Sequence, residues 1–299
     1  MMQIISKRKY FYVVSGVLTL ASLAILISWG LKFGIDFTGG TEMKVRFSQN
    51  VPNNNVIADK LKELDLESLM VKAAADRTVT VDYRNSNDQI NRDVFGKIKE
   101  LDGSAVQVST DFIGSTVSAQ LKNSAIKALI LAILGIALYI AWAFRKVSRP
   151  VSSWKYGLGA ITALAHDILI TVGVFVILGK FFGVEVGVPF IAALLTILGY
   201  SVNDTIVVFD RTRENLLRAG AKEDFEDIVN RSLNETLARS INTSLTVIIV
   251  LFALVIFGGE SIRYFSVALL FGVTFGTYSS IYVASALLVT IYKFQIKKA

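Results

Sequence analysis

The chain has 299 residues, of which 53% are hydrophobic and 18% are charged, and its formal net charge is +7. This composition is too apolar for an ordinary soluble domain of that length and indicates a membrane protein. The chain has no cysteine and one histidine, which excludes disulfides and thiol chemistry and argues against a zinc site. The sequence contains no P-loop, HExxH or GxSxG pattern, so we expect no metal, no ATP hydrolysis and no enzymatic activity.

Six apolar stretches are long enough to cross the roughly 30 Å hydrocarbon core of a bilayer as helices. They cover residues 10–31, 124–144, 156–179, 186–209, 241–258 and 264–292. The first follows Lys7, Arg8 and Lys9, as a signal peptide would, but its apolar run is longer than the apolar region of a typical signal peptide and ends without a small-residue cleavage site. We therefore predict six transmembrane helices, the first of them retained.

The short loops differ in their content of basic residues. Lys and Arg precede the first span and cluster at 145–155, 211–239 and 293–298, whereas the opposite short loops contain only Lys180 and Arg263. Because basic loops stay on the cytoplasmic side, both termini are predicted to be cytoplasmic. This asymmetry also explains the net positive charge, and we expect a lipid bilayer as the surroundings and no nucleic acid as a partner.

The same topology predicts three parts of the chain. Residues 1–31 form a cytoplasmic N-terminus and the first transmembrane helix. Residues 32–123 form a domain outside the cytoplasm. Residues 124–299 form the other five transmembrane helices, with a cytoplasmic loop at 210–240.

The external segment is predicted to fold as a small α+β domain. Alternating apolar residues indicate strands at 41–48, 69–75, 78–83 and 105–112. Helical spacing indicates one helix that begins at Asn53, Asn54 or Asn55 and a second at 87–101. The order β-α-β-β-α-β is that of the ferredoxin-like fold, in which two helices cover one face of a four-stranded sheet. The fold class is therefore an α-helical polytopic membrane protein with a small external ferredoxin-like domain.

Small residues recur every four positions in the last span: Ala268, Gly272, Gly276, Ser280 and Ala284. Such a stripe lets helix backbones approach closely in a membrane. We expect a helix-packing role for it. Because the chain has one set of six helices without an obvious internal repeat, we expect this packing to include a second subunit of similar architecture.

Two carboxylates lie inside predicted spans. An aspartate at a helix centre costs about 2.5 to 3.5 kcal/mol, so such residues usually face a polar interior and carry function. Asp167, in the third span, shares a face with small residues and should point at another helix. Asp204, near the end of the fourth span, could instead be wetted from the cytoplasm or capped by the hydroxyls of Tyr200 and Ser201. His166 could be a neutral histidine bonded to a carbonyl group.

Arg239 opens the fifth span, and polar residues follow it at i+3, i+4 and i+7. The alternative to a functional role is a surface ion pair with Glu235, four residues earlier. The preceding residues 221–238 show apolar residues on one face. They predict a cytoplasmic amphipathic helix that lies along the membrane or on a partner.

Four stretches, in this order on six predicted helices, resemble the SecF family of bacterial protein-export membrane proteins, which belongs to the RND transporter superfamily. They are FGIDFTGGTEM at 33–43, ALAHD at 163–167, GYSVNDTIVVFDRTREN at 199–215 and RSINTSLT at 239–246. The resemblance covers essentially the whole chain. It departs at IGSTVSAQL, residues 113–121, where the family tends to have a proline-containing element, so it does not predict the connection into the second helix.

The resemblance implies a location in the cytoplasmic (inner) membrane and a role as a proton-driven accessory of the Sec translocon. The implied partners are SecD, the SecYEG translocon and the unfolded polypeptide that is exported. The proton gradient is the implied energy source, without a cofactor. By the resemblance Asp204 and Arg239 belong to the proton relay. We expect Asn203 to belong to the same relay, together with Asp167 or His166. Adjacent helical residues diverge by about 100°, so one of these two should face Asp204, and Asp167 is favoured. Asp36, Gly39 and Gly40 are expected to form a structural motif.

Two other function classes remain open. One is half of an RND-type exporter of small molecules, although one external domain of this size leaves little room for a drug-sized pocket and a docking platform. The other is a membrane scaffold without transport activity, against which the intramembrane carboxylates argue.

Overall fold

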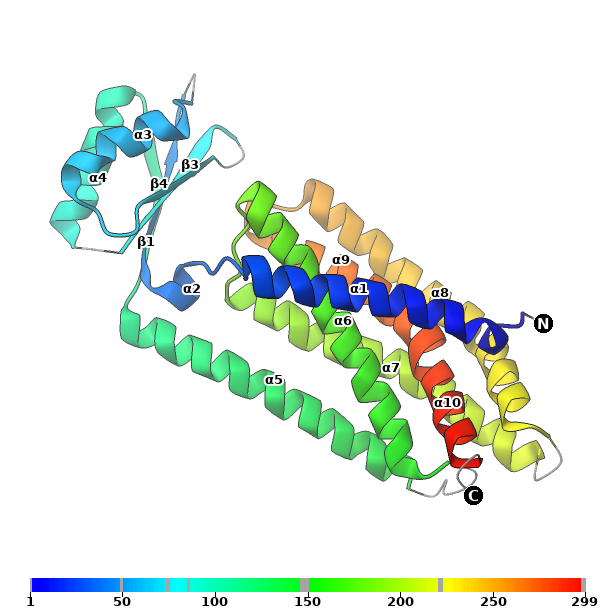
Figure 1. Ribbon diagram of the computed structural model, residues 1–299. Coiled ribbons are helices and arrows are strands. Elements are labelled where there is room, and N and C mark those ends of the chain that lie inside the picture. The colour runs from blue at the N-terminus through cyan, green and yellow to red at the C-terminus, as the bar shows by residue number, and fades with distance from the viewer. Residues whose placement is uncertain are drawn as a thin grey trace. The chain divides into compact units, whose positions relative to one another are not determined.

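The computed structural model describes residues 2–48, 51–73, 76–84, 87–145, 151–219 and 223–296 (Figure 1). The chain divides into two compact units. The helical unit contains Met1–Leu31, Lys127–Phe182 and Pro189–Ala299, and the sheet unit contains Lys32–Ile126 together with Gly183–Val188. The sheet unit therefore includes a short segment that lies between two long helices in the sequence.

The sheet unit contains four antiparallel strands in the order β2-β3-β1-β4. The strands are β1 (Gly40–Arg46), β2 (Met70–Ala73), β3 (Thr78–Tyr83) and β4 (Val106–Ile113). Helices α3 (Asn54–Leu61), which continues as a 3-10 turn at Lys62–Leu64, and α4 (Asp88–Leu101) lie on one side of the sheet (Figure 1). The ferredoxin-like fold predicted from the sequence is confirmed.

Local sequence signals explain these elements. Met43 and Val45 are completely buried at alternating positions of β1, so one face of the strand meets the core beneath the helices. The side chain of Asn53 accepts a hydrogen bond from the Asn55 amide (3.0 Å) and caps α3, and Asn87 accepts one from the Ile90 amide (2.7 Å) and caps α4.

Two glycines join a short helix, α2 (Ile35–Thr38), to β1. Gly39 has φ 71° and Gly40 has φ 125°, a backbone region that favours glycine. A Cβ atom at Gly40 would lie 2.7 Å from the carbonyl oxygen of Tyr83. Glycine at this position therefore allows β1 to start directly beside the end of β3.

The helical unit contains long helices. A 3-10 turn (Ile5–Lys7) leads into α1 (Arg8–Trp29), and four further helices follow: α5 (Ser115–Ala143), α6 (Ser153–Phe182), α7 (Val188–Ala219) and α8 (Phe225–Phe257). The last span consists of α9 (Glu260–Ser279), a π-helical turn (Ser280–Ala284) and α10 (Ser285–Ile296). Among the described residues, six helices are long and apolar enough to cross a membrane. The prediction of six spans is confirmed, and the chain is a multi-pass membrane protein.

The six spans differ in how far they are buried within the chain. In the most apolar window of each span, 56% of the residues of α6 and 50% of those of α7 and of the last span are buried, against 11% for α1, 6% for α5 and 17% for α8. The interior of the helical unit is therefore built from α6, α7 and the last span. Most of the apolar surface of the other three helices remains available to lipid or to a partner.

The structure describes one connection that the resemblance left open and corrects one prediction. The segment 115–121, where the resemblance departs, is helical and forms the first turns of α5. The residues predicted as a cytoplasmic amphipathic helix along the membrane or on a partner are, where described, the first half of α8, which continues without a break into the fifth span. The predicted helix is confirmed, but its expected place along the membrane or on a partner is wrong, because Phe225, Val229 and Leu233 pack into the core of the helical unit.

Candidate functional site

Asp167, in the middle of α6, is completely buried. One carboxylate oxygen lies 2.9 Å from Nδ1 of His166. The other oxygen accepts hydrogen bonds from the hydroxyl groups of Ser201 (2.6 Å) and Ser279 (2.7 Å). Because Ser201 belongs to α7 and Ser279 to α9, the carboxylate joins three helices.

Asp204, in α7, has 8% of its surface exposed. Its two oxygens accept hydrogen bonds from different helices: Oδ1 from the Ser240 hydroxyl of α8 (2.5 Å) and Oδ2 from the Ser280 hydroxyl of the last span (2.7 Å). The alternative of capping by Tyr200 and Ser201 is wrong. The Tyr200 hydroxyl donates to Ser244 (3.2 Å), and Ser201 binds the other aspartate.

The two carboxylates are linked through neighbouring residues of the last span, since Ser279 binds Asp167 and Ser280 binds Asp204. A π-helical turn begins at Ser280, and π turns inside α-helices are frequent at functional sites. Gly276 lies three residues before Ser279, and a Cβ atom there would lie 3.0 Å from Cβ of Ser201. The glycine therefore allows the last span to approach α7 closely enough for these hydrogen bonds.

His166 is also buried, with 5% of its surface exposed. Its ring stacks on that of Tyr278, with 6.2 Å between the ring centres. The ring binds Asp167 through Nδ1, so the alternative of a histidine bonded to a carbonyl group is wrong. Nε2 is buried and has no hydrogen-bond partner among the described residues.

The cluster consists of carboxylate, imidazole and hydroxyl groups, all of which can take part in hydrogen bonds that carry a proton. A hydroxyl group both donates and accepts hydrogen bonds, so each serine beside a carboxylate can follow a change in the proton on that carboxylate. Among the described residues, no group of three or more acidic or histidine side chains could hold a metal ion. The described hydrogen-bond partners of both carboxylates are hydroxyl groups and one imidazole.

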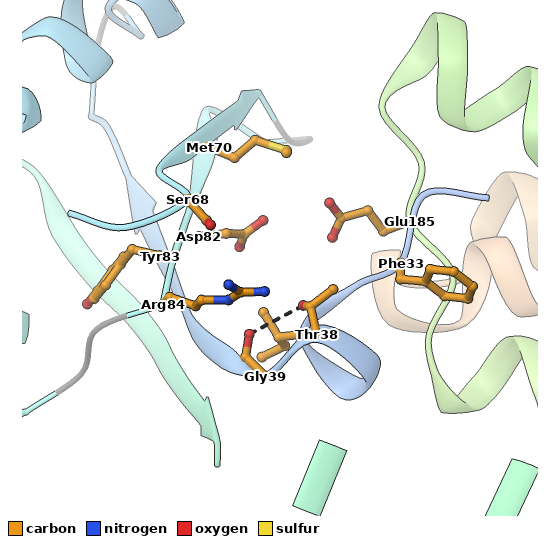
Figure 2. Close-up of a pocket in the computed structure, with 10 residues that line it drawn as sticks. Phe33, Thr38, Gly39, Ser68, Met70, Asp82, Tyr83, Arg84 and Glu185 are labelled. Carbon is orange, nitrogen blue, oxygen red and sulfur yellow. Dashed lines mark hydrogen bonds between the residues drawn. The ribbon is translucent and has the colours of Figure 1, made fainter. Parts of the chain in front are cut away.

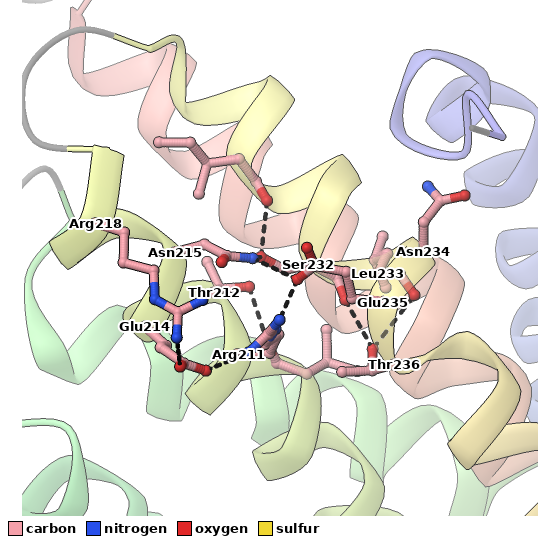
Figure 3. Close-up of polar contacts among 12 residues, drawn as sticks. Arg211, Thr212, Glu214, Asn215, Arg218, Ser232, Leu233, Asn234, Glu235 and Thr236 are labelled. Carbon is pink, nitrogen blue, oxygen red and sulfur yellow. Dashed lines mark hydrogen bonds and ion pairs between the residues drawn. The ribbon is translucent and has the colours of Figure 1, made fainter.

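Arg239 is not part of the cluster. Its side chain is exposed, and the described residues give it no ion pair. The alternative of a pair with Glu235 is also wrong, because Glu235 accepts hydrogen bonds from Arg211 (2.6 Å) and from Asn215 (2.8 Å), as Figure 3 shows for the contact between α7 and α8. Asn203 is likewise exposed, although it adjoins Asp204 in the sequence.

The structure thus brings together Asp167, His166 and Asp204 and leaves Arg239 and Asn203 on the surface of the chain. Sequence reasoning missed the serines that bind the carboxylates. Two of them, Ser279 and Ser280, lie in or beside the small-residue stripe of the last span, and a pair of adjacent hydroxyl residues in an apolar helix was a signal that could have identified them.

The small-residue stripe itself packs within the chain. A Cβ atom at Gly272 would overlap the side chain of Ile197 in α7, and Ala268, Ser280 and Ala284 are completely buried. The predicted helix-packing role of the stripe is confirmed within the chain, and the expectation that a second subunit packs on it is wrong, because α7 already occupies it.

In the sheet unit, the segment Gly183–Val188 pairs with the residues before the Gly39–Gly40 turn. The Val186 amide donates to the Lys32 carbonyl group (2.8 Å), and the Gly34 amide donates to the Val186 carbonyl group (3.0 Å). The Asp36 carboxylate accepts a hydrogen bond from the Val188 amide (2.7 Å). The segment between α6 and α7 is therefore built into the sheet unit by backbone pairing.

A group of charged residues strengthens this attachment. Lys72 of β2 forms ion pairs with Asp82 of β3 and with Glu185 of the segment, the latter at 2.5 Å. Burial raises the pKa of the Asp82 carboxyl, and Lys72 only partly offsets it. Burial lowers the pKa of Lys72, but Asp82 and Glu185 outweigh burial and raise it. Figure 2 shows Asp82, Arg84 and Glu185 around a cavity of about 140 Å³.

Comparison with known proteins identifies the family. The model of the family described as "Protein export membrane protein SecD/SecF, C-terminal" matches residues 94–294, and that of the SecD/SecF GG motif matches residues 26–51, which include Gly39 and Gly40. The chain belongs to the SecD/SecF family. It is 45% identical to the protein translocase subunit SecF of Thermobaculum terrenum, over 97% of this chain and 94% of that protein. It is 39% identical to the SecF subunit of Haemophilus influenzae, over 94% of this chain and 83% of that protein.

A solved structure of a member of this family is also similar to the chain. The crystal structure of SecDF, a translocon-associated membrane protein from Thermus thermophilus, matches with a TM-score of 0.85 and 32% sequence identity. The match covers 97% of this chain but only 38% of the SecDF chain. The chain therefore spans well under half of that protein. The family expected from the four sequence stretches is confirmed.

Proposed function

We propose that the chain is an accessory subunit of a protein translocase in the cytoplasmic membrane, where it uses the proton gradient to assist the export of unfolded polypeptides. It acts as a transport subunit and not as an enzyme. The names of its relatives support this assignment. The 38% coverage of a SecDF chain supports a SecD-type partner that supplies the rest of the machine, next to a SecYEG-type translocon.

The observation that carries the proposal is the pair of buried carboxylates linked through adjacent serines. Asp167 and Asp204 lie on neighbouring helices of the chain's interior, and Ser279 and Ser280 bind one each. A buried carboxylate favours its protonated form more than one in water does, and a cation brought close to it favours the charged form. A site of this kind can take up a proton from one side and release it to the other.

Arg239 supplies that cation in the proposed cycle. It directly precedes Ser240, whose hydroxyl binds Asp204. Adjacent helical residues differ by about 100° around the axis, so a rotation of α8 would exchange the serine for the guanidinium at the carboxylate. His166 and Asp167 extend the relay on α6, and Asn203 faces the surface that a partner would cover.

The segment Gly183–Val188 offers a route from the proton site to the sheet unit. It connects α6, which carries Asp167, with α7, which carries Asp204. Its backbone is paired with the residues before the Gly39–Gly40 turn. A shift of either helix along its axis would therefore pull directly on the sheet unit.

The proposed orientation places both termini in the cytoplasm and residues 32–123 outside, as the basic loops indicate. Reporter fusions at Asn87 and at Glu223 test it. They are expected to report opposite sides of the membrane, and signals from the same side would contradict the topology.

The function is tested by translocation of a precursor protein into inverted membrane vesicles with and without a proton gradient. Asp204→Asn keeps the size of the side chain but cannot ionise, so it should remove the stimulation by the gradient. Arg239→Lys keeps the charge but loses the planar guanidinium, so it should be partly defective. Asp210→Asn, at an exposed position of the same helix that pairs with Arg213, is the control and should respond like the unmodified protein. Full stimulation with Asp204→Asn would refute the proposal.

A further inference from the structure

Strand β4 is an edge of the sheet. It pairs with β1 only, and the described residues give its outer side no partner. The opposite edge, β2, has four residues, whereas β4 has eight. The unpaired amide and carbonyl groups of a long edge strand form a ready template for another extended chain.

Proteins usually protect such edges with lysine, proline or a bulge. The pairing of β4 shifts register opposite Lys44 and Val45, so its first residues carry a bulge. Beyond that point Ser109–Ile113 pairs regularly, contains no lysine or proline, and presents Phe112 with 58% of its surface exposed. The stretch 109–113 is therefore an open edge on which an apolar side chain is displayed.

A cavity lined by four carboxylates adjoins this edge. Its volume is about 500 Å³, and its lining includes the carboxylates of Asp36, Glu42, Asp111 and Glu185 but no basic side chain. Three of these carboxylates have partners in the sheet unit: the Val188 amide for Asp36, Lys44 for Glu42 and Lys72 for Glu185. Asp111 has none among the described residues. Burial raises the pKa of the Glu42 carboxyl, and the nearby Asp82 carboxylate raises it further, against the opposing effect of Lys44.

Successive side chains of β4 point to opposite faces of the sheet, so Asp111 and Phe112 lie on different faces. Asp111 lies opposite Glu42 of β1, so the two share the sheet face that the helices leave uncovered. Phe112 lies opposite Thr41, on the other face, and it also lines a second cavity of about 500 Å³ beside the Gly39–Gly40 turn. A strand added to β4 would therefore place successive side chains next to a carboxylate and next to an aromatic ring.

We propose that Ser109–Ile113 binds an extended polypeptide segment by strand addition, with a basic side chain beside Asp111 and an apolar side chain beside Phe112. Main-chain pairing provides the affinity and tolerates many sequences, and the two side-chain positions provide selectivity. Asp111 is the carboxylate of this cavity without a partner among the described residues, so the charge at the edge fits a basic peptide and not an anionic lipid surface. The inference deepens the proposed function, because an exported chain is extended and varied in sequence.

The test measures binding of fluorescent nine-residue peptides to the full chain in nanodiscs of neutral lipid, by anisotropy. One peptide alternates lysine and valine, and a second replaces each lysine by glutamate. A third and a fourth are the lysine peptide with the backbone nitrogens methylated along one edge or along the other. The lysine peptide is expected to bind about tenfold more tightly than the glutamate peptide. Methylation of the peptide edge that faces β4 should abolish binding, because it removes the amide donors of the backbone hydrogen bonds between the peptide and β4.

Asp111→Lys reverses the charge at the edge and should exchange the preference between the lysine and glutamate peptides. Asp93→Lys makes the same change at an exposed position of α4, away from the edge, and should leave the preference unchanged. Equal effects of the two substitutions, or binding that survives methylation of either edge of the peptide, would overturn the proposal. A photocrosslinker at Thr110 that, in native membranes, reacts only with lipid or with a strand of another membrane subunit would also overturn it.

These outcomes are separable from the proposed function, because peptide binding requires no proton gradient. Loss of gradient stimulation with Asp204→Asn tests the proton site alone. Peptide binding could persist in Asp204→Asn while export fails to respond to the gradient even in the unmodified protein. That pair of results would refute the proposed function but would still support peptide binding at β4.

Discussion

Replacement of Lys72 by methionine should loosen the attachment of the segment Gly183–Val188 to the sheet. The substitution keeps the length and removes the charge that Asp82 and Glu185 share. The exposed fractions of the three side chains are 19%, 12% and 17%. Removal of one partner from a buried ion pair costs about 3 to 5 kcal/mol, and the remaining exposure favours the lower end of that range. About 3 kcal/mol corresponds to a roughly hundredfold increase in the local opening equilibrium.

The pH dependence of this effect has a definite sign. Burial already raises the pKa of Asp82 above its unfolded value, and Lys72 opposes that shift. Without Lys72 the pKa rises further, so the folded state gains stability when the pH falls through it. The loss caused by Lys72→Met should therefore be larger at pH 7 than at pH 5. The pKa of Lys72 itself is raised from an already high value, so its charge is constant over this range.

Hydrogen exchange measured by mass spectrometry on the full chain tests the prediction. The amides of Val186 and of β3 should exchange roughly a hundredfold faster in Lys72→Met at pH 7. Lys97→Met is the matched control, because Lys97 pairs with the exposed side chain of Glu63 (2.6 Å) and its loss should change nothing measurable. Unchanged exchange in Lys72→Met, or a larger effect at pH 5 than at pH 7, would refute the reasoning.

Three further substitutions have expected outcomes. Gly272→Leu should prevent assembly of the helical unit, because a side chain there overlaps α7, whereas Gly135→Leu, at an α5 position with no neighbour within 4 Å, should fold normally in a detergent stability assay. Ser280→Ala removes a hydrogen bond to a buried carboxylate, worth about 1.5 to 3 kcal/mol, and should reduce gradient-stimulated export, whereas Ser266→Ala, which removes a buried hydroxyl without a described partner, should not. Gly40→Ala should destabilise the sheet unit by more than about 2 kcal/mol, because its φ of 125° and the carbonyl oxygen 2.7 Å from the new Cβ both oppose a side chain; normal thermal stability would contradict this.

The fold of the sheet unit could be predicted because its signals are local. Asparagine caps at positions 53 and 87 fix where α3 and α4 begin, and the alternation of Met43 and Val45 identifies the buried face of β1. The attachment of Gly183–Val188 could not be predicted. It depends on backbone hydrogen bonds between residues about 150 positions apart in the sequence, and a short extended segment carries no period that would indicate its partner.

The candidate site could be predicted only in part. The cost of a carboxylate in a membrane identified Asp167 and Asp204 without any structure, because that argument needs only their position in an apolar run. Their partners depend on which face of each helix meets which neighbour. The four serines come from three helices. Whether Ser240 or the adjacent Arg239 faces Asp204 depends on how α8 is rotated about its axis, and the spacing of residues in the sequence does not determine that rotation.

The central claim is that protonation of carboxylates on α6 and α7 acts on the sheet unit through the segment between these helices. Hydrogen exchange at the Val186 amide, measured in proteoliposomes with and without a proton gradient, tests it most directly. The account predicts that the gradient changes this exchange in the unmodified protein and in Asp210→Asn, and that it has no effect in Asp204→Asn. An exchange rate that ignores the gradient in the unmodified protein, or that responds equally in Asp204→Asn, would contradict the account.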